Sequence, residues 1–371
     1  MRLRGIRRLV MDPGAASHPL TRRVSECMAP MVPALSSEAT KSEPDDNPDE
    51  PAGMDKETLH LVSFPGELLK PCPGTGDDYI CCGYQILNVG TNCPLNCSYC
   101  ILQAYMNHPS LRLFVNLPEA LPGIARRIDR DPSRLWRIGT GEFTDSLALD
   151  PVAGWTEWLL PFMADRKNAV LELKTKTAQI EGLIASPHRD RIIVSWSLNS
   201  PWIVSREEHG APSLETRLRA AARCQEEGFV VGFHFDPLFL YPEWRDGYRR
   251  ALDLIDRHIT PKKVIWMSMG AMRFMPRLKP IIRRRHPETK VLHGEFVRGM
   301  DGKMRYFRPL RTELYGFLRE LITQWHQDAG LYLCMESHEV WKESMGWSPG
   351  TSSGLASFLD ARVRKMFSMQ P

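Results

Sequence analysis

Three cysteines, Cys93, Cys97 and Cys100, lie within the short stretch TNCPLNCSYC. Their spacing is Cys-x3-Cys-x2-Cys, and it follows directly on an apolar run at 84–89 that predicts a β-strand. Three thiolates on one tight loop can ligate three irons of a [4Fe–4S] cluster and leave the fourth iron open. The alternatives are a zinc site that lacks its fourth ligand, or three unrelated thiols. Zinc knots usually add a second CxxC or an HxxxH, and none follows here, so the spacing favours the cluster.

The chain has nine cysteines, and six of them lie between positions 72 and 100. An odd number in a sequence without a secretion signal argues for metal ligation rather than a disulfide framework. Cys72, Cys81 and Cys82 precede the predicted first strand. They either ligate a second metal, or Cys72 lies in a loop while one of the adjacent pair points into the core. Cys224 and Cys334 lie in a predicted helix and strand, and we interpret them as structural.

Length and composition indicate a soluble globular protein. The chain has 371 residues, with 43% hydrophobic and 25% charged residues and a net charge of +4. This charge is too small to demand a polyanionic partner by itself. No run of about 18 apolar residues occurs, and the N-terminal sequence lacks a signal peptide. We therefore expect a cytoplasmic protein without a membrane span.

Four regions follow from the patterning. Residues 1–56 are rich in Pro, Ser and charged residues and predict a disordered extension. A cysteine-containing lead-in segment covers 57–83, alternating strands and helices cover 84–340, and 341–371 predicts a helical tail. The predicted strands are 84–89, 135–138, 169–173, 191–197, 229–235 and 263–269, and the clearest helices are 118–129, 154–166, 213–227 and 243–258. About six βα units indicate an α/β fold with a parallel sheet, closed or partly closed into a barrel. Catalytic residues of such barrels lie at the carboxyl ends of the strands.

The cysteine spacing resembles the signature of the radical S-adenosylmethionine (SAM) superfamily, and Tyr99 before the third cysteine fits its CxxxCxΦC form. The resemblance implies a partial TIM barrel with SAM bound to the open iron. It also implies SAM-binding residues at later strand ends, where the alternative is ordinary loop chemistry. Glu142 in GTGE would hold the methionine amino group. Lys176 would face the carboxylate, and Ser197 and Asn199 would bond the ribose or the carboxylate.

Longer stretches resemble the spore photoproduct lyase family, whose members reverse a thymine dimer in DNA by radical chemistry. The similar segments, over roughly residues 84–335, are CPLNCSYCILQAY, LRLFVNL, LKTKTAQIEGLI, SWSLNS, SLETRLRAAARCQEEGFVVGFHFDPLFLYPEWRDGY and the basic GKMRYFRPLR. The resemblance implies reductive cleavage of SAM to a 5′-deoxyadenosyl radical and radical C–C bond cleavage in a DNA lesion. It also implies an electron donor such as flavodoxin or ferredoxin.

Two positions depart from the pattern of this family. The lyases carry a hydrogen-donating cysteine just after the second strand, whereas this chain has EFTDSLA there, with Asp145 and Ser146 in the region. An O–H bond is much stronger than an S–H bond, so neither residue replaces a thiol. The lyases also carry a relay tyrosine after the third cluster cysteine, and here it is Ile101. Tyr99 is retained as a catalytic candidate, and Cys81 or Cys82 would supply the missing hydrogen atom.

Substrate contacts are expected from basic and aromatic side chains, because a lesion in duplex DNA must be flipped out and its phosphates held. The candidates are Lys303, Arg305, Tyr306 and Arg308, together with His234 at the end of the fifth predicted strand. Alternating cations and aromatics favour backbone contact combined with base stacking. A packed structural histidine is the alternative for His234. Two other functions stay open for the chain: radical SAM chemistry on an RNA, a peptide or a small molecule, and a non-catalytic iron–sulfur or zinc protein that binds nucleic acid.

Overall fold

The computed structural model describes residues 5–30, 32, 35–36, 55–74 and 78–369. The chain divides into two compact units that are each built from discontinuous segments. The first unit comprises Met1–Lys70, Gln85–Asn96 and Leu102–Ile192, and the second comprises Pro71–Tyr84, Cys97–Ile101 and Ile193–Pro371. The region boundaries that the sequence predicts at 57, 84 and 341 stay predictions. Among the described residues, no helix is both long and apolar enough to cross a membrane.

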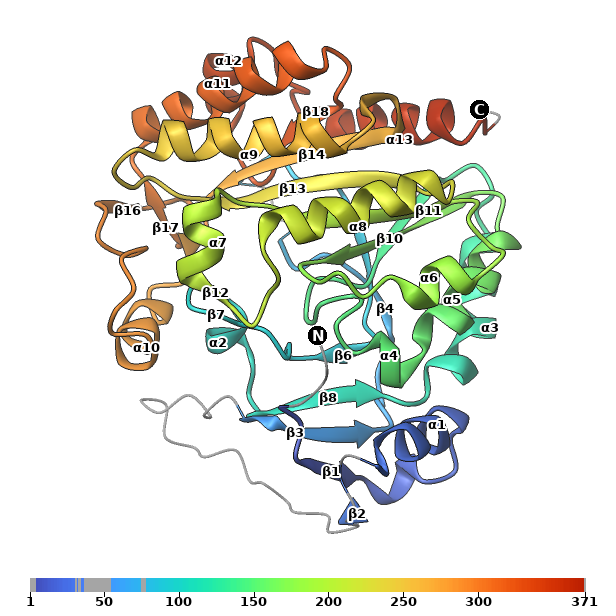
Figure 1. Ribbon diagram of the computed structural model, residues 1–371. Helices are drawn as coiled ribbons and strands as arrows, with labels where there is room; N and C mark the ends of the chain where they lie inside the picture. The colour runs from blue at the N-terminus through green and yellow to red at the C-terminus, as the bar shows by residue number, and fades with distance from the viewer. Residues whose placement is uncertain (1–4, 31, 33–34, 37–54, 75–77, 370–371) are drawn as a thin grey trace. The chain divides into compact units, whose positions relative to one another are not determined.

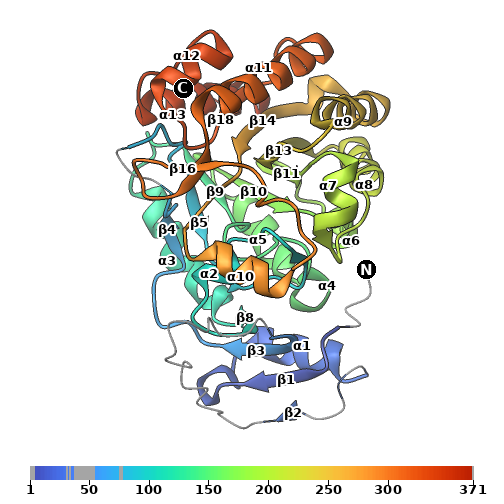
Figure 2. The same ribbon diagram turned by 90° about the vertical axis from the view of Figure 1, so that its left-hand side faces the viewer.

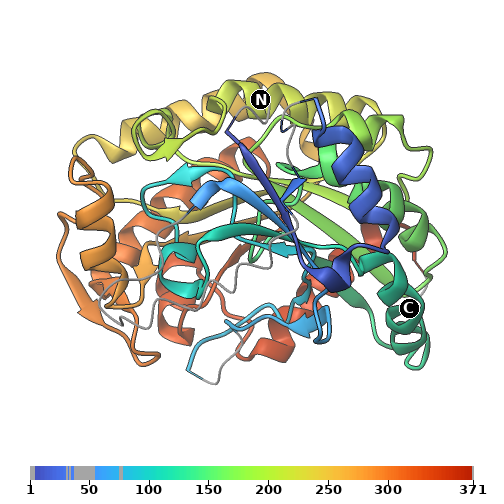
Figure 3. The same cartoon turned by 90° about the horizontal axis from the view of Figure 1, so that it is seen from below.

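A five-stranded sheet in the first unit has the order β2-β1-β3-β8-β6. Its strands are β1 (Arg8–Met11), β2 (Leu35–Ser36), β3 (Asp55–Val62), β6 (Gly90–Thr91) and β8 (Ser110–Phe114). β1 and β8 both pair with β3 in parallel, and their alternating apolar residues bury one face. Figures 2 and 3 show the dark-blue β1 beside the blue β3 and the teal β8.

The N-terminal residues correct the prediction of disorder over 1–56. Residues 8–28 form β1, a short 3-10 helix η1 (Pro13–Ala15) and α1 (Pro19–Met28). α1 buries Leu20, Val24 and Met28, which recur at four-residue spacing on one face. The prediction relied on average composition and missed this period, so it is wrong for these residues. The most polar part of the predicted extension, 37–54, lies outside the described residues.

The first unit also contains four strands in the order β10-β9-β5-β4. They are β4 (Leu69–Pro71), β5 (Gln85–Leu87), β9 (Trp136–Gly139) and β10 (Ala169–Thr175), and β9 pairs in parallel with both β5 and β10. Besides α1, the helices of this unit are α2 (Leu102–Tyr105), α3 (Leu117–Asp129), α4 (Asp150–Ala153), α5 (Trp155–Ala164) and α6 (Glu181–Ala185). The carboxyl ends of β9 and β10 therefore lie side by side.

The second unit carries a parallel sheet in the order β18-β14-β13-β11, with β11 (Ile192–Ser197), β13 (Val230–Leu238), β14 (Val264–Ala271) and β18 (Leu331–Leu333). Its helices are α7 (Pro201–Glu207), α8 (Leu214–Glu226), α9 (Trp244–His258), α10 (Leu278–Arg285), α11 (Arg308–Trp325), α12 (His338–Met345) and α13 (Ser352–Met366), with a 3-10 turn η2 (Pro261–Lys263). α8 packs along β13, and α9 contacts both α8 and α11 (Figure 1). Short strands complete the set: β7 (Asn96–Cys97), β12 (Glu208–His209) and the antiparallel β15 (Arg273–Phe274), β17 (Met304–Tyr306) and β16 (Phe296–Arg298).

Each strand and helix named from the sequence coincides with an observed element to within a few residues. The strand predicted at 169–173 is β10, and the one at 263–269 is β14, whose residues are all buried. Continuous apolar runs of this kind are typical of parallel strands covered on both faces. The prediction of an α/β fold with parallel strands is confirmed.

A buried carboxyl group at the start of α4 makes stability depend on pH. Burial raises the pKa of Asp150 from 3.8 to about 6, although Thr156 donates two hydrogen bonds to its carboxyl group, at 3.0 and 2.7 Å. A carboxyl whose folded pKa is raised stabilises the fold at low pH, and this contribution is lost as pH rises through the folded pKa. Relative to Asp150→Asn, the wild type should therefore lose up to roughly 3 kcal/mol of unfolding free energy between about pH 4 and pH 6. Urea unfolding of both proteins across this range measures the difference, and a difference that does not vary with pH would contradict the assignment.

Candidate active site

The backbone of the cysteine loop is held by polar side chains of the first unit. The Lys56 ammonium donates to the carbonyl of Cys93 at 2.6 Å and also to the carbonyl of Leu95. The side-chain oxygen of Asn92 accepts from the Cys93 N–H at 2.9 Å, and Asn92 itself has a positive φ of 69°. Because side chains satisfy its backbone groups, this turn keeps a fixed shape without a regular element.

The three cysteines of the loop differ in exposure, and their role as cluster ligands stays a prediction. Cys97 is buried, whereas Cys93 and Cys100 are partly exposed. The Cys100 N–H donates to the Cys97 carbonyl at 3.2 Å, which closes a tight turn between these two thiols. Arg285 lies near enough to Cys100 for their charges to interact. Soft thiolate donors on one held turn are the set that an iron–sulfur cluster requires.

In the second unit a buried carboxylate holds Ser98, the residue between two of these cysteines. Glu207 accepts from the Ser98 hydroxyl and from the Thr289 hydroxyl, the latter at 2.5 Å. The Ser98 N–H also donates to the Glu207 carbonyl at 2.8 Å. The end of α7 and the turn after α10 therefore both fix the cluster loop.

A buried ion pair holds the next residue, Tyr99. The Tyr99 hydroxyl donates to Glu208, and Glu208 pairs with Arg217 of α8 at 2.5 Å with both side chains essentially inaccessible. Burial, reinforced by the negative charge of Glu208, raises the pKa of Tyr99 well above its ordinary value. Tyr99 is thus a neutral phenol whose proton already points at a carboxylate acceptor.

The loop after β9 packs closely on the end of β10. The Asp145 carboxylate accepts from the Leu147 and Ala148 N–H groups, from the Thr175 hydroxyl and from the Lys176 N–H. A Cβ on Gly141 would lie 2.9 Å from the Cβ of Lys174, so only glycine permits this approach. Asp145 therefore holds the two strand ends together, which is a structural role that leaves no part for it as a hydrogen donor.

Replacing Asp145 by asparagine should lower the free energy of unfolding by about 2 kcal/mol. In the wild type both carboxylate oxygens accept hydrogen bonds, and the NH₂ group of asparagine cannot accept one in place of an oxygen. Urea denaturation measures this change. Asp165→Asn, at an exposed position, is the matched control and should stay within about 0.5 kcal/mol of the wild type. Equal effects of the two substitutions would contradict the role of Asp145.

Two of the expected SAM-binding residues lie at these strand ends of the first unit. Glu142 follows β9 and Lys176 follows β10, and both side chains are half-buried. Glu142 makes no hydrogen bond or ion pair with any residue that the structure describes. Its carboxylate is therefore available to an ammonium group, and the roles of both residues in SAM binding stay predictions.

The other expected polar residues lie in the second unit. Ser197 of β11, His234 of β13 and Ser268 of β14 are opposite one another in register. His234 is buried, and its Nδ1 shares a hydrogen bond of 2.6 Å with the Ser268 hydroxyl. Asn199 is used internally: its amide donates to the Pro237 carbonyl and its oxygen accepts from the Tyr248 hydroxyl. The structure thus brings Ser197 and His234 into one row but gives Asn199 partners of its own.

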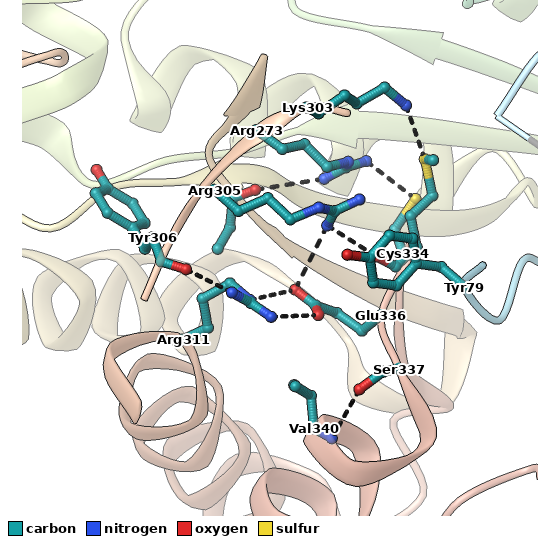
Figure 4. A network of polar contacts seen from close by, with 12 residues as sticks. Tyr79, Arg273, Lys303, Arg305, Tyr306, Arg311, Cys334, Glu336, Ser337 and Val340 are labelled. Atoms are coloured by element: carbon teal, nitrogen blue, oxygen red, sulfur yellow. Dashed lines mark hydrogen bonds and ion pairs between the residues drawn. The ribbon is translucent and has the colours of Figure 1, made fainter. Parts of the chain in front are cut away.

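Three residues that the sequence predicts to contact the substrate, Lys303, Arg305 and Tyr306, belong to a network of polar contacts (Figure 4). Arg305 is buried, bonds Asp301 at 2.7 Å and stacks over the Tyr79 ring with its guanidinium 4.0 Å from the centroid. Lys303 also pairs with Asp301, at 3.4 Å, and Tyr306 is buried. Lys303, Arg305 and Tyr306 therefore have a structural role inside the protein. Their contact with the substrate stays a prediction.

The chain immediately around Arg308 is more open. Arg308 is exposed and pairs with Glu343 at 3.4 Å. The neighbouring Phe307 is 56% exposed, and Met300 in the β16–β17 hairpin is 65% exposed, beside the exposed Arg298. Exposed apolar side chains next to cations are the features expected at a nucleic-acid contact.

The lead-in cysteines are held in the second unit. Cys81 is buried and its N–H donates to the Ser352 hydroxyl at 3.0 Å, while Cys82 is half-buried. Burial raises the pKa of Cys334, whose sulfur accepts from Arg273 at 3.3 Å, and Cys81 and Cys72 lie near enough to add to this shift. Three thiols are therefore neighbours here, and a catalytic role for Cys81 or Cys82 stays a hypothesis.

Sequence reasoning missed the acidic supports of the loop, Glu207 and Glu208, and their partner Arg217. One signal was present. Arg217 lies on the apolar face of its helix, between Leu214 and Leu218 and in line with Ala221, and all four are buried. A charge in that position is buried with a partner, because an unpaired one would be too costly.

Comparisons with known proteins agree with this geometry. A model of the spore photoproduct lyase family matches residues 81–329. Curated spore photoproduct lyases of Geobacillus sp. (strain Y412MC61) and Bacillus subtilis (strain 168) are each 24% identical to this chain, over 206 and 205 residues. These matches cover 55% and 54% of this chain and 60% of the length of each relative, so the chain spans less than two thirds of the curated relatives it matches.

Solved structures extend the likeness to the fold. A spore photoproduct lyase complexed with dinucleoside spore photoproduct superposes with a TM-score of 0.75 and 21% identity, covering 89% of this chain and 99% of that one. A mutant lyase with bound AdoMet and the same dinucleoside gives 0.73 and 20%, covering 90% and 99%. At these identities the superpositions show the fold, an α/β partial barrel. Because the family model matches more than half of the residues, this chain belongs to the spore photoproduct lyase family of the radical SAM superfamily.

Proposed function

We propose that this protein is a radical SAM enzyme that acts on a photolesion in DNA. The observation that carries the proposal is the set of three thiols on one held turn, Cys93, Cys97 and Cys100, in a chain with this family's fold. A [4Fe–4S] cluster on these thiolates would supply one electron for reductive cleavage of SAM, giving a 5′-deoxyadenosyl radical. The electron would come from a small carrier such as flavodoxin or ferredoxin.

Polar residues at the strand ends would hold SAM in place. Glu142 would accept hydrogen bonds from the methionine ammonium of SAM, and Lys176 would pair with its carboxylate. Ser197 and Asn199 would contact the carboxylate or ribose, Asn199 through the remaining N–H of its amide. Glu207 and Glu208 would act indirectly. Their hydrogen bonds with Ser98 and Tyr99 fix the loop that carries the thiols.

Tyr99 would take part in the radical chemistry because of its hydrogen bond. A tyrosine loses an electron more easily when a base receives its proton at the same time, and Glu208 already accepts the hydrogen bond of that proton. The buried Arg217 forms an ion pair with that carboxylate. With Ile101 in place of a second tyrosine, Tyr99 would act alone beside the cluster.

A DNA substrate is supported by the exposed side chains near Arg308. Phe307 directly precedes Arg308, and Met300 lies two residues after Arg298; all four side chains are exposed. Cations would hold phosphates while the apolar side chains stack on unpaired bases. The bound dinucleoside in the solved relative supports a nucleic-acid substrate for this chain as well.

Incubation with a spore-photoproduct dinucleotide tests the substrate. The protein is first reconstituted anaerobically with iron and sulfide, then given SAM and dithionite. Recovery of thymine dinucleotide is the expected result. If SAM is cleaved and no thymine dinucleotide forms, lesion repair is contradicted and another substrate is favoured. Another substrate is considered because the chain lacks the usual hydrogen-donor cysteine in EFTDSLA.

A further inference from the structure

A second group of metal-ligating side chains lies apart from the cysteines. His209 ends β12, His286 follows the last residue of α10, and Glu288 lies in the turn beyond it. One ligand atom from each of these residues lies within 4.8 Å of the other two. All three belong to the second unit, where residues distant in sequence bring their side chains together.

The two imidazoles are arranged face to face. Their rings are nearly parallel, at 13°, with centroids 5.8 Å apart. The His286 Nδ1 and the nearest Glu288 oxygen are 3.9 Å apart, which is too far for a hydrogen bond. The His286 Nε2 is buried and has no hydrogen-bond partner among the described residues. A buried ring nitrogen without a partner is costly, and an ion or a water between these groups would satisfy it.

The donor atoms determine which ion fits. Two imidazole nitrogens and one carboxylate oxygen are ligands of borderline divalent transition metals, above all Zn²⁺, and are poor ligands for an iron–sulfur cluster. Glu288 has 64% of its side chain exposed, so an ion can enter from solvent. We propose that His209, His286 and Glu288 bind one Zn²⁺ or a similar divalent transition metal, with water completing the coordination.

The neighbours of this site give the metal a role. His209 directly follows Glu207 and Glu208, and Glu288 directly precedes Thr289. Glu207 and Thr289 bond to each other and to Ser98, and Glu208 bonds to Tyr99. A metal shared by His209 and Glu288 would therefore join the two segments that hold the cluster loop, and would stabilise that loop from outside.

Zinc binding by the cluster-loaded protein tests the proposal. Iron then occupies the cluster thiols, so equilibrium dialysis reports other sites. We expect one Zn²⁺ per chain in the wild type and at least about tenfold weaker binding in His286→Ala, His209→Ala and Glu288→Gln. The matched control is His293→Ala, which removes an exposed histidine of the same segment and should bind as the wild type does. Zinc should also raise the melting temperature of the wild type and the control, and not of the three variants.

The spectrum of bound Co²⁺ is a further measurement of the ligand set. Co²⁺ bound in place of zinc should show d–d bands without thiolate charge transfer. Three results would each overturn the site. The first is zinc binding by Glu288→Gln and His209→Ala that equals the wild type, the second is absence of zinc from the wild type, and the third is thiolate charge-transfer bands in the cobalt spectrum. Because His209 and Glu288 are not fully buried, their variants keep the test valid if His286→Ala does not fold.

Discussion

Replacing Cys97 by alanine should reduce 5′-deoxyadenosine formation to the background rate, even after anaerobic incubation with iron and sulfide. Two remaining thiolates cannot hold three irons, and Cys97 is the buried ligand among the three. The variant should also bind less iron and lack the brown absorbance of a cluster. Iron analysis, visible spectra and chromatography of the nucleoside product measure these quantities on one sample.

The matched control is Cys224→Ala, which removes another buried cysteine from α8. It should keep its iron and its SAM cleavage, because Cys224 packs as a small apolar side chain. Loss of iron in both variants would indicate general destabilisation. Full activity in Cys97→Ala would exclude the cysteine loop as the cluster site.

Replacing Arg217 by methionine should lower the free energy of unfolding by about 3–5 kcal/mol. The substitution leaves the Glu208 carboxylate buried without its cation, and that side chain is only 1% exposed. It also removes the guanidinium hydrogen bonds to the carbonyls of Pro212 and Ser197, each at 3.0 Å. Denaturant unfolding followed by circular dichroism measures the loss.

An exposed pair on the same helix provides the control. Arg219 and Glu215 also bond at 2.7 Å, but their side chains are 70% and 42% exposed. Arg219→Met should therefore cost no more than about 0.5 kcal/mol. Removing both charges with Glu208→Gln and Arg217→Met should recover part of the loss. Similar costs for Arg217→Met and Arg219→Met would contradict the buried pair as a support of the cluster loop.

Local patterns predicted much of the fold and the centre of the site. Strand β14 reads VIWMSMGA, and its continuous burial follows from a parallel strand covered on both faces. The cysteine motif needs only eight residues, so its chemistry can be predicted from spacing alone. Strand β1 was missed because it pairs with β3, which lies well beyond the window of a local pattern, whereas the period of α1 was visible in the sequence.

Long-range partners account for the remaining misses. Tyr99 and Glu208 are 109 residues apart, and nothing near either residue indicates the other. Arg305 belongs to a basic stretch that predicts a surface, yet Asp301 and the Tyr79 ring hold its guanidinium inside. Whether a charge is buried depends on contacts with residues far away in the sequence, such as Tyr79 for Arg305, so the burial of Arg305 could not be predicted from its basic stretch.

The most direct test is SAM cleavage by the reconstituted wild-type protein. With a [4Fe–4S] cluster verified by electron paramagnetic resonance and with dithionite present, the protein should convert SAM to 5′-deoxyadenosine and methionine in equal amounts. Omission of iron should abolish both products. A protein that holds the verified, reduced cluster on Cys93, Cys97 and Cys100 and leaves SAM intact would contradict its assignment as a radical SAM enzyme.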